Sequence, residues 1–292
     1  MLAALIILFG NIAQAKTFEI LTPKVHRGNI AVIKIYPQFQ TQAEGRPICI
    51  AVKWDGPDKP GQEYQPNNQG EIFIGIETDK KPDKYVVIRI ECGRGIQLDF
   101  GYEELEIVEK NFPIRKRGHF KPTKKWADER EIIKNAFADG NYFEKYFKDE
   151  FIKPLDRIPL DQSRAIGDIS LLGKFGAGHG GVDLITLNPK TKNYKRPVRA
   201  INSGRIALIA KNFSTEGNMV IIDHGSGIFS VYMHLFNFNA VKVGEQIKKG
   251  DVIGISGQSG RVGGPHLHFA VKVSNSYVDP FGFIETANRY LN

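Results

Sequence analysis

Beyond its first residues, the sequence has no apolar run long enough to cross a lipid bilayer. It also has no internal repeat and no low-complexity tract. Its basic residues gather in "RKRGHFKPTKK" (115–125), but this stretch has no regularly spaced aromatic residues and no nucleic-acid-binding motif. These absences exclude a multispanning membrane protein. We therefore interpret the basic stretch as a solvated linker and expect no nucleic acid partner.

Cysteine is scarce, since the 292 residues include only Cys49 and Cys92. In an oxidising compartment these two residues could form one disulfide. The expected strand faces argue against a bridge, because Cys92 shares the apolar face of "YVVIRIEC" whereas Cys49 shares a face of "ICIAVKW" with Lys53. The sequence leaves open whether the two cysteines are bridged.

The start of the chain, "MLAALIILFGNIAQA", has the pattern of an export signal. Its apolar run from Leu2 to Phe9 is followed by Ala13-Gln14-Ala15, the small-x-small pattern at which signals are cleaved. This predicts a signal peptide over residues 1–15 and a periplasmic or cell-envelope location. No cysteine follows the run, so we expect neither a lipid anchor there nor stable membrane insertion after cleavage.

The overall composition, 41% hydrophobic and 25% charged residues, is that of a soluble globular protein. The length is sufficient for two domains that each bury a core. The formal net charge of +8 favours anionic surroundings such as nucleic acid, anionic lipid or acidic wall polymer. An exported protein would meet the wall or envelope first.

The spacing of turn-forming residues between short β-forming runs predicts a mainly β fold in three parts after the signal peptide. Residues 16–110 contain short runs of Val, Ile, Tyr and Phe broken by Gly, Pro and Asn clusters, which predicts an antiparallel β-sandwich of roughly seven strands. Trp54 follows Cys49 by only five residues, so the immunoglobulin signature is not convincing. Residues 151–292 show strand-like runs separated by Gly turns and no amphipathic helix of ten residues, which predicts a compact all-β domain.

Residues 111–150 are expected to form a basic and helical connector between these two domains. In "KKWADEREIIKNAFADG" the apolar residues recur near one helical face, and Gly140 is well placed to end the helix. The expected face consists of Trp126, Ile132, Ile133, Ala136 and Phe137. The following "YFEKYFKDEF" predicts a second short helix.

Histidine is concentrated in the last part of the chain, where His179, His224, His234, His266 and His268 account for five of the seven. Side chains alternate along a strand, so in "PHLHF" the two histidines should point to one face while Leu267 points into the core. His179 in "GAGHGGVD" and His234 in "VYMHL" lie in Gly-flanked or strand-end settings. Glycine neighbours allow a close approach to a ligand.

This set of residues suits a catalytic zinc ion, which commonly takes three His or carboxylate ligands and leaves one position for water. His179 and Asp183 form a His-x-x-x-Asp pair, and His268 or His266 can supply the third ligand. Zinc lowers the pKa of a bound water to about 7, which provides a nucleophile at neutral pH.

The order of "HGGVD", "GNMVIIDHGSGIFSVYMHL", "GDVIGISGQSGRVGGPHLHF" and "YVDP" resembles the lysostaphin-type M23 metallopeptidases, also called LytM-domain proteins, over roughly residues 150–285. The resemblance implies one zinc ion per chain, bound by His179, Asp183 and His268. It also implies that His266 and His234 assist catalysis, with His266 as the base, although the sequence does not separate their roles.

The chain departs from the family pattern at two places, the compact "LLGKFGAGHGGVD" and the longer "LITLNPKTKNYKRPVRA", which can reshape the rim of the site. The resemblance implies a structural role for His224 in the turn "DHG". Asp223 and Asp279 are likewise interpreted as turn residues.

The resemblance implies a zinc-dependent endopeptidase that hydrolyses peptide cross-links of bacterial peptidoglycan, with the stem peptides as its substrate. A D,D-type cross-link is preferred over a glycine bridge, because no LysM-like repeat or C-terminal SH3-like domain is seen.

Three other functions compete with this one. A cupin metal site is disfavoured, because Lys272 and Val273 stand where its motif requires Glu. A non-catalytic LytM-domain regulator of a wall amidase would typically lack ligands that are present here. A latent enzyme, covered by its N-terminal part, stays open. The sequence does not indicate the bond that is cut, protein partners or the oligomeric state.

Overall fold

The computed structural model describes residues 18–36, 49–54, 61–77, 85–94, 97–110, 114–115, 121–156, 169–170, 180–188 and 190–290. The expected signal peptide over 1–15, residues 116–120 of the basic stretch, and His179 lie outside these ranges. No helix among the described residues is long and apolar enough to span a bilayer. The fold is mainly β, as predicted.

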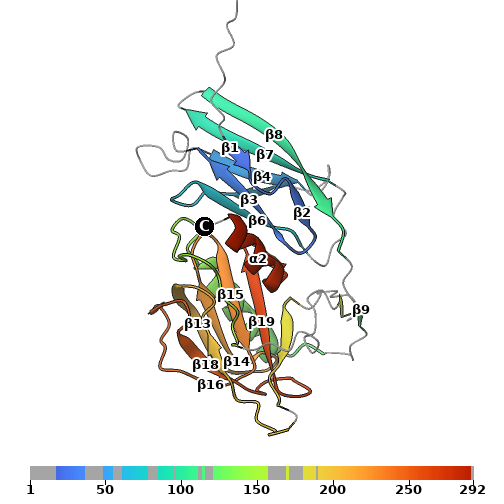
Figure 1. The fold of residues 1–292 in the computed structure, drawn as a ribbon, viewed down its shortest axis with the longest axis vertical. Helices are drawn as coiled ribbons and strands as arrows, with labels where there is room; N and C mark the ends of the chain where they lie inside the picture. The colour runs from blue at the N-terminus through green and yellow to red at the C-terminus, as the bar shows by residue number, and fades with distance from the viewer. Residues whose placement is uncertain are drawn as a thin grey trace, which may run out of the picture.

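The N-terminal part forms two sheets that enclose one hydrophobic core (Figure 1). The first sheet has the order β1-β3-β6, and the second β2-β8-β7-β4-β5. The strands are β1 (Phe18–Ile20), β2 (Lys24–His26), β3 (Ile30–Ile35), β4 (Cys49–Trp54), β5 (Gln62–Tyr64), β6 (Glu71–Gly75), β7 (Tyr85–Arg94) and β8 (Gln97–Val108). The pairing differs from the expected antiparallel one at β2, which runs parallel to β8.

The two cysteines lie directly opposite each other on β4 and β7, and Cys49 is disulfide-bonded. Cys92 is the only other cysteine in the sequence. The strand-face argument against a bridge is wrong, because Lys53 occupies the same inward face as Cys49 and is only 3% exposed. The charge of Lys53 had suggested that this face of β4 points to solvent, whereas the face is buried.

The helix predicted in the connector is confirmed as α1 (Lys124–Ala138). It begins at Thr123, whose side chain accepts a hydrogen bond from the Trp126 backbone N–H, as an N-cap does. The buried stripe is Glu129, Ile133 and Phe137, which are spaced four apart. Ile132 is 46% exposed, so its expected place on the buried face is wrong.

The second connector helix is not formed. Residues 142–151 run as an irregular strap whose backbone groups bond to the turn around His224 instead of to one another. Tyr146 and Phe147 donate their backbone N–H groups to the His224 carbonyl, and Ser226 donates to the Glu144 carbonyl. A helix would require these same backbone groups for its own turns.

The C-terminal part contains a large antiparallel sheet in the order β11-β19-β15-β14-β13-β17, with β20 also paired to β19, and a smaller sheet in the order β12-β18-β16. The large sheet consists of β11 (Val182–Ile185), β13 (Gly204–Phe213), β14 (Gly217–Asp223), β15 (Ile228–Met233), β17 (Gln246–Ile247), β19 (His266–Val273) and β20 (Ser276–Val278). The small sheet consists of β12 (Pro197–Arg199), β16 (Leu235–Phe238) and β18 (Val252–Ser256). A separate parallel pair joins β9 (Ile114–Arg115) to β10 (Ile169–Ser170).

The expectation that no amphipathic helix follows Phe151 is wrong, because α2 (Pro280–Tyr290) ends the described chain. Asp279 caps it by accepting from the Phe281 N–H, and Pro280 takes the first helical position, where a missing N–H costs nothing. Phe283 and Ile284 point into the core. The early Pro and Gly in "PFGF" hid this helix from the sequence pattern.

One hydrophobic core spans the two sheet systems. Ile30, Val32 and Phe73 of the N-terminal sheets belong to the same buried cluster as Phe147 and Phe151 of the strap. Figure 1 shows α2 lying where the N-terminal sheets meet the large C-terminal sheet, and α2 contacts both β3 and β19. The expected boundary between residues 150 and 151 therefore crosses continuous packing, and the domain limits stay a proposal.

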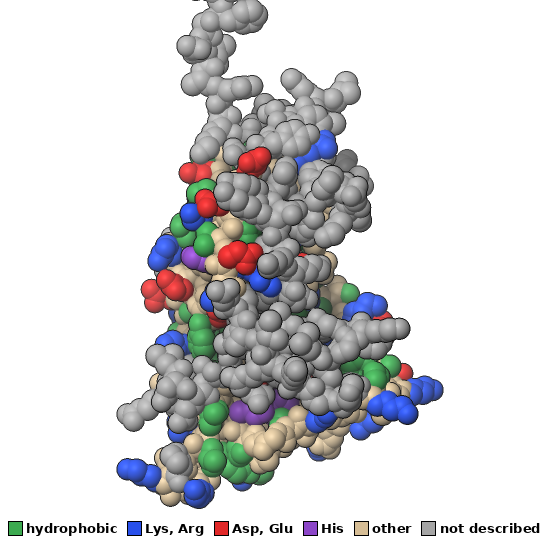
Figure 2. Space-filling model, turned by 90° about the vertical axis from the view of Figure 1, so that its right-hand side faces the viewer, with side chains coloured by type: hydrophobic (Ala, Val, Ile, Leu, Met, Phe, Trp, Pro, Cys, Tyr) green, Lys and Arg blue, Asp and Glu red, His purple; other side chains and the backbone are tan. Residues whose placement is uncertain are grey.

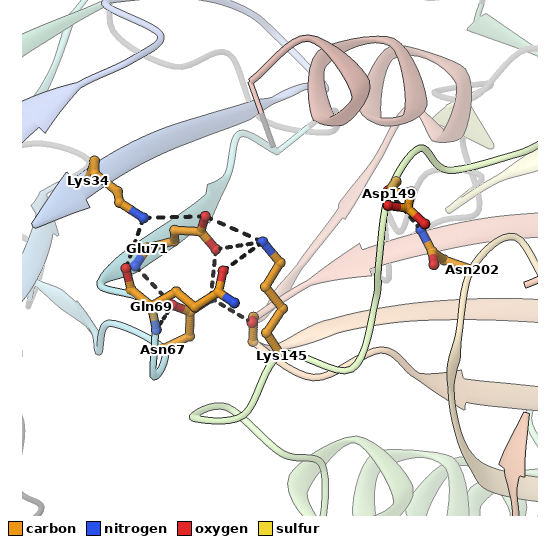
Figure 3. A network of polar contacts seen from close by, with 8 residues as sticks. Lys34, Asn67, Gln69, Glu71, Lys145, Asp149 and Asn202 are labelled. Carbon is orange, nitrogen blue, oxygen red and sulfur yellow. Dashed lines mark hydrogen bonds and ion pairs between the residues drawn. The ribbon is translucent and has the colours of Figure 1, made fainter. Parts of the chain in front are cut away.

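A polar network joins the strap to both parts of the molecule (Figure 3). The Lys145 ammonium lies 3.2 Å from Glu71 Oε2 and 3.0 Å from Gln69 Oε1. Asn67 Nδ2 donates to Glu71 Oε2 at 3.0 Å and to Ser226 Oγ at 2.9 Å. The Lys145 and Glu71 side chains are only 11% and 10% exposed. The network therefore ties the N-terminal β6 region to the strap and to the turn after β14.

Reduction of the disulfide should lower the stability of the N-terminal sheets. We expect the free energy of unfolding to fall by about 2–4 kcal/mol when reductant is added, because the crosslink restricts the unfolded chain. Urea unfolding followed by circular dichroism measures this change. The Cys49→Ala/Cys92→Ala variant should show no response to reductant; a reductant-independent midpoint in the wild type would contradict the bridge.

Loss of the Lys145 ammonium should destabilise the contact between the two parts. We expect Lys145→Met to lower the free energy of unfolding by about 2 kcal/mol, because it removes one of the two lysines, Lys145 and Lys34, that pair with the nearly buried Glu71 carboxylate. The matched control is Lys148→Met, an exposed lysine of the same strap, which should change stability by less than about 0.5 kcal/mol. Equal effects of the two variants in urea unfolding would show that the network is not stabilising.

Candidate metal centre

The predicted site residues meet across one pair of neighbouring strands. β11 pairs antiparallel with β19, which places Asp183 opposite His268 and Ile185 opposite His266. The two histidines share a face of β19 because they are two residues apart. Leu267 between them is fully buried, as predicted.

The carboxylate of Asp183 lies against both imidazoles. Its Oδ1 is 3.0 Å from His268 Nδ1 and 3.6 Å from His266 Nε2. Asp183 is 6% exposed and His268 8%. A carboxylate this buried is costly unless a cation or a hydrogen-bond donor compensates it. Either a protonated His268 ring nitrogen or a shared metal ion would do so.

The donor set fits zinc, which binds imidazole nitrogen and carboxylate oxygen at about 2.0–2.2 Å. Two such ligands on one tetrahedral ion lie about 3.3 Å apart, close to the 3.0 Å between Asp183 Oδ1 and His268 Nδ1. Within the described residues, no group of three or more His, Cys, Asp and Glu side chains could hold a metal ion by itself. The third predicted ligand, His179, is outside those residues.

The backbone at Gly181 lies against the His268 ring. A Cβ atom at Gly181 would lie 2.9 Å from His268 Nε2 and 2.5 Å from the Phe269 carbonyl oxygen, so the chain passes closely over this ring. Gly181 follows His179 by two residues. The His268 ring thus has its Nδ1 edge against the Asp183 carboxylate and its Nε2 edge against the Gly181 backbone.

His234 approaches the same site from a bend between β15 and β16. Its backbone is in the left-handed region, with φ of 64°, which is uncommon for a residue with a side chain and marks a constrained position. The bend brings the His234 ring centroid within 4.8 Å of the His266 ring centroid and 6.1 Å of that of His268. Three of the predicted histidines and Asp183 are therefore brought together.

Hydrogen bonds to backbone carbonyls fix the tautomers of His234 and His266. His234 Nδ1 donates to the Ser259 carbonyl oxygen at 2.9 Å, and His266 Nδ1 donates to the Gly264 carbonyl oxygen at 2.8 Å. Each Nε2 then carries the lone pair and can accept a proton. Burial, with the neighbouring charges of His268 and His266, lowers the pKa of His234 to about 3. His234 is therefore neutral at physiological pH.

Ser259 is a positioning residue that the sequence analysis did not identify. Besides accepting from His234, it donates its hydroxyl to the Leu235 carbonyl at 2.8 Å and accepts from the Asn218 N–H at 2.8 Å. It therefore fixes both the His234 ring and the start of β16. Close packing leaves no room for a side chain at Gly217, where a Cβ would lie 2.4 Å from Ser259. Only the Gly-flanked "GQSG" hinted at this tight turn.

The other candidate residues have structural roles. His224 is fully buried, with Nδ1 donating to the Ser203 carbonyl and Nε2 bonded to the Ser230 hydroxyl. Burial lowers the pKa of His224 to about 4. Asp223 accepts the backbone N–H groups of Gly225 and of Asn141, the residue before the strap, which stabilises the turn.

Figure 2 shows histidine side chains reaching the surface low on this face of the molecule, with hydrophobic and basic side chains nearby. The site residues are mostly covered, because His266, the most open of the three on β11 and β19, has a side chain only 17% exposed.

Comparison with known proteins identifies the domain. Over 150 residues the chain is 31% identical to peptidoglycan DD-endopeptidase ShyA of Vibrio cholerae serotype O1, covering 49% of this chain and 33% of ShyA. It is 38% identical over 122 residues to glycyl-glycine endopeptidase ALE-1 of Staphylococcus capitis, covering 40% of this chain and 32% of ALE-1. The chain thus spans about a third of the length of these relatives.

A crystal structure of a candidate peptidase M23 from Pseudomonas aeruginosa has the same fold over most of the chain. It superposes with a TM-score of 0.55 at 21% identity, covering 88% of this chain and 94% of that one. Residues 177–280 match Peptidase family M23. The chain therefore contains a peptidase family M23 domain, and the predicted resemblance is confirmed.

Proposed function

We propose that this protein is a zinc-dependent endopeptidase that hydrolyses peptide cross-links in bacterial peptidoglycan. The observation that carries the proposal is the convergence of Asp183, His268, His266 and His234 at the meeting point of β11, β19 and the bend after β15. Relatives that match this domain are named as peptidoglycan DD-endopeptidase and glycyl-glycine endopeptidase.

His179, Asp183 and His268 would hold one zinc ion per chain. When bound, zinc supplies a Lewis acid that polarises the scissile carbonyl and lowers the pKa of a water molecule. The buried Asp183 carboxylate would compensate part of the charge of the cation. The His268 ring keeps its Nδ1 toward that carboxylate because the Gly181 backbone passes beside its Nε2.

His266 would act as the general base. Its Nδ1 hydrogen bond to the Gly264 carbonyl leaves Nε2 free to accept the proton that the attacking water loses. The water oxygen then bonds to the carbonyl carbon, the C–N bond breaks, and the proton passes to the leaving amine. His234, held neutral with Nδ1 donating to the Ser259 carbonyl, would assist His266 by accepting a hydrogen bond from the attacking water at Nε2.

The D,D-type cross-link is the proposed substrate, and the proposed setting is the periplasm or cell envelope after export. The relatives include both DD- and glycyl-glycine endopeptidases, so the family alone does not decide the bond. The alternative, a non-catalytic regulator of a wall amidase, is disfavoured because four residues of the proposed machinery are present and lie together. A latent enzyme differs from the proposal only in needing activation.

Purified peptidoglycan tests the activity directly. We expect the zinc-loaded protein to release soluble peptides whose masses correspond to cut cross-links, because the site would bring zinc and a base to one carbonyl. Chelator should abolish release and added zinc should restore it. A protein that releases nothing but accelerates an added wall amidase would instead support the regulatory alternative.

Two variants should distinguish a residue that binds the metal from one that acts only in turnover. We expect Asp183→Ala to lose both zinc and activity, whereas His266→Ala should keep about one zinc per chain and lose at least about 100-fold in turnover. Elemental analysis of the purified variants measures the metal. His26→Ala, at an exposed histidine of β2, is the control and should match the wild type. Equal zinc retention in the first two variants would contradict their separate roles.

A further inference from the structure

The segment between β11 and β12 is basic and firmly attached. Residues 186–196, "TLNPKTKNYKR", contain four Lys or Arg residues and no Asp or Glu. Arg196 Nε donates to the Thr186 carbonyl at 3.1 Å, which closes the segment at its base. At its tip the Asn188 and Lys192 backbones bond to each other. This basic segment starts directly after Ile185, the residue opposite His266.

Hydrogen bonds on both sides fix the Lys195 backbone against β18. The buried Ser256 hydroxyl donates to the Tyr194 carbonyl at 2.7 Å and accepts from the Arg196 N–H at 3.0 Å. The exposed Lys195 side chain crosses to the neighbouring strand β16, where its ammonium lies 3.5 Å from the centroid of the Phe236 ring. Phe236 is 48% exposed, so solvent reaches the pair that it forms with Lys195.

The backbone of Phe236 is linked to that of His266 through one intervening residue. Phe236 follows His234 by two residues. Gly257, next to Ser256, forms a backbone bridge with His266, and a Cβ at Gly257 would lie 2.3 Å from the Phe236 backbone nitrogen. Backbone contacts therefore connect Phe236 to His266 through Gly257 alone.

The three segments around Lys195 and Phe236 carry no acidic residue. Residues 234–240 carry no Lys, Arg, Asp or Glu, and residues 257–265 carry only Arg261. Together with the four cations of 186–196, these segments favour an anionic ligand. A glycine bridge has no side-chain charge, whereas a stem peptide with free carboxylates has several. An ammonium resting on an aromatic face keeps N–H groups directed outward for such a carboxylate.

We propose that Lys195, held over the Phe236 ring, is a specificity-determining residue that binds a free carboxylate of the peptide substrate. The proposal rests on the proposed function and names the feature by which this site would distinguish a carboxylate-bearing cross-link from a neutral one.

Two synthetic cross-linked peptides test this assignment, one with free carboxylates and one with the same carboxylates amidated. We expect the zinc-loaded wild type to have a lower KM for the free-carboxylate peptide. Lys195→Gln should raise that KM about fivefold with little change in kcat, and should leave the amidated peptide unaffected. Phe236→Leu should weaken the same preference, because it removes the aromatic face. Lys190→Gln, an exposed cation of the same segment, is the matched control and should change KM less than about twofold.

Calorimetry should measure the binding of both peptides to the metal-free wild type and to metal-free Lys195→Gln. Because it needs no cleavage, this measurement tests the Lys195 subsite independently of the endopeptidase activity. Carboxylate-dependent binding through Lys195 without cleavage by the zinc-loaded protein would uphold the subsite and overturn the endopeptidase. Cleavage with equal KM values for the two peptides, or a Lys195→Gln effect that is the same for both, would overturn the subsite and leave the endopeptidase intact. Absence of both binding and cleavage would overturn both.

Discussion

The buried carboxylate of Asp183 is the constraint on which the site depends. Antiparallel pairing of β11 with β19 sets it opposite His268, 3.0 Å from the ring nitrogen, where water is largely excluded. A charge in such a position requires a cation or a strong donor. A shift of one residue in this register would turn His266 and His268 to the opposite face and leave Asp183 without a partner. The neighbouring strands β15 and β20 on β19 hold that register.

The second part of the site depends on a backbone bend. His234 leaves the large sheet in a left-handed conformation, and the chain continues into the small sheet as β16. Ser259 stabilises both sides of this bend, since it bonds the His234 ring and the Leu235 carbonyl. The same bend places Phe236 beside Gly257, so the proposed catalytic residue and the proposed specificity element are set by one turn of the chain.

Residue types and spacing predicted much of this arrangement. The His-x-His strand and α1 follow from alternation and helical periodicity, and the family resemblance is confirmed. The strand-end setting singles out His234, and only the resemblance implies its catalytic role. What the sequence could not predict depends on tertiary contacts. Lys53 is buried, so its charge wrongly suggested that the strand face of Cys49 points to solvent. Asp279 and Pro280 begin a helix in a sequence that resembles a turn. The turn at His224 binds the backbone of residues 142–151 and so keeps them from forming a helix. Ser259 holds the His234 ring through its backbone carbonyl, which any residue type would supply, so no motif could identify this contact.

The most direct test of the account is anomalous diffraction from crystals of the zinc-loaded protein at the zinc absorption edge. We expect one peak about 2.0–2.2 Å from both Asp183 Oδ1 and His268 Nδ1, with His266 Nε2 outside bonding distance. A peak elsewhere, or no peak while His268 keeps its hydrogen bond to Asp183, would contradict the metal centre.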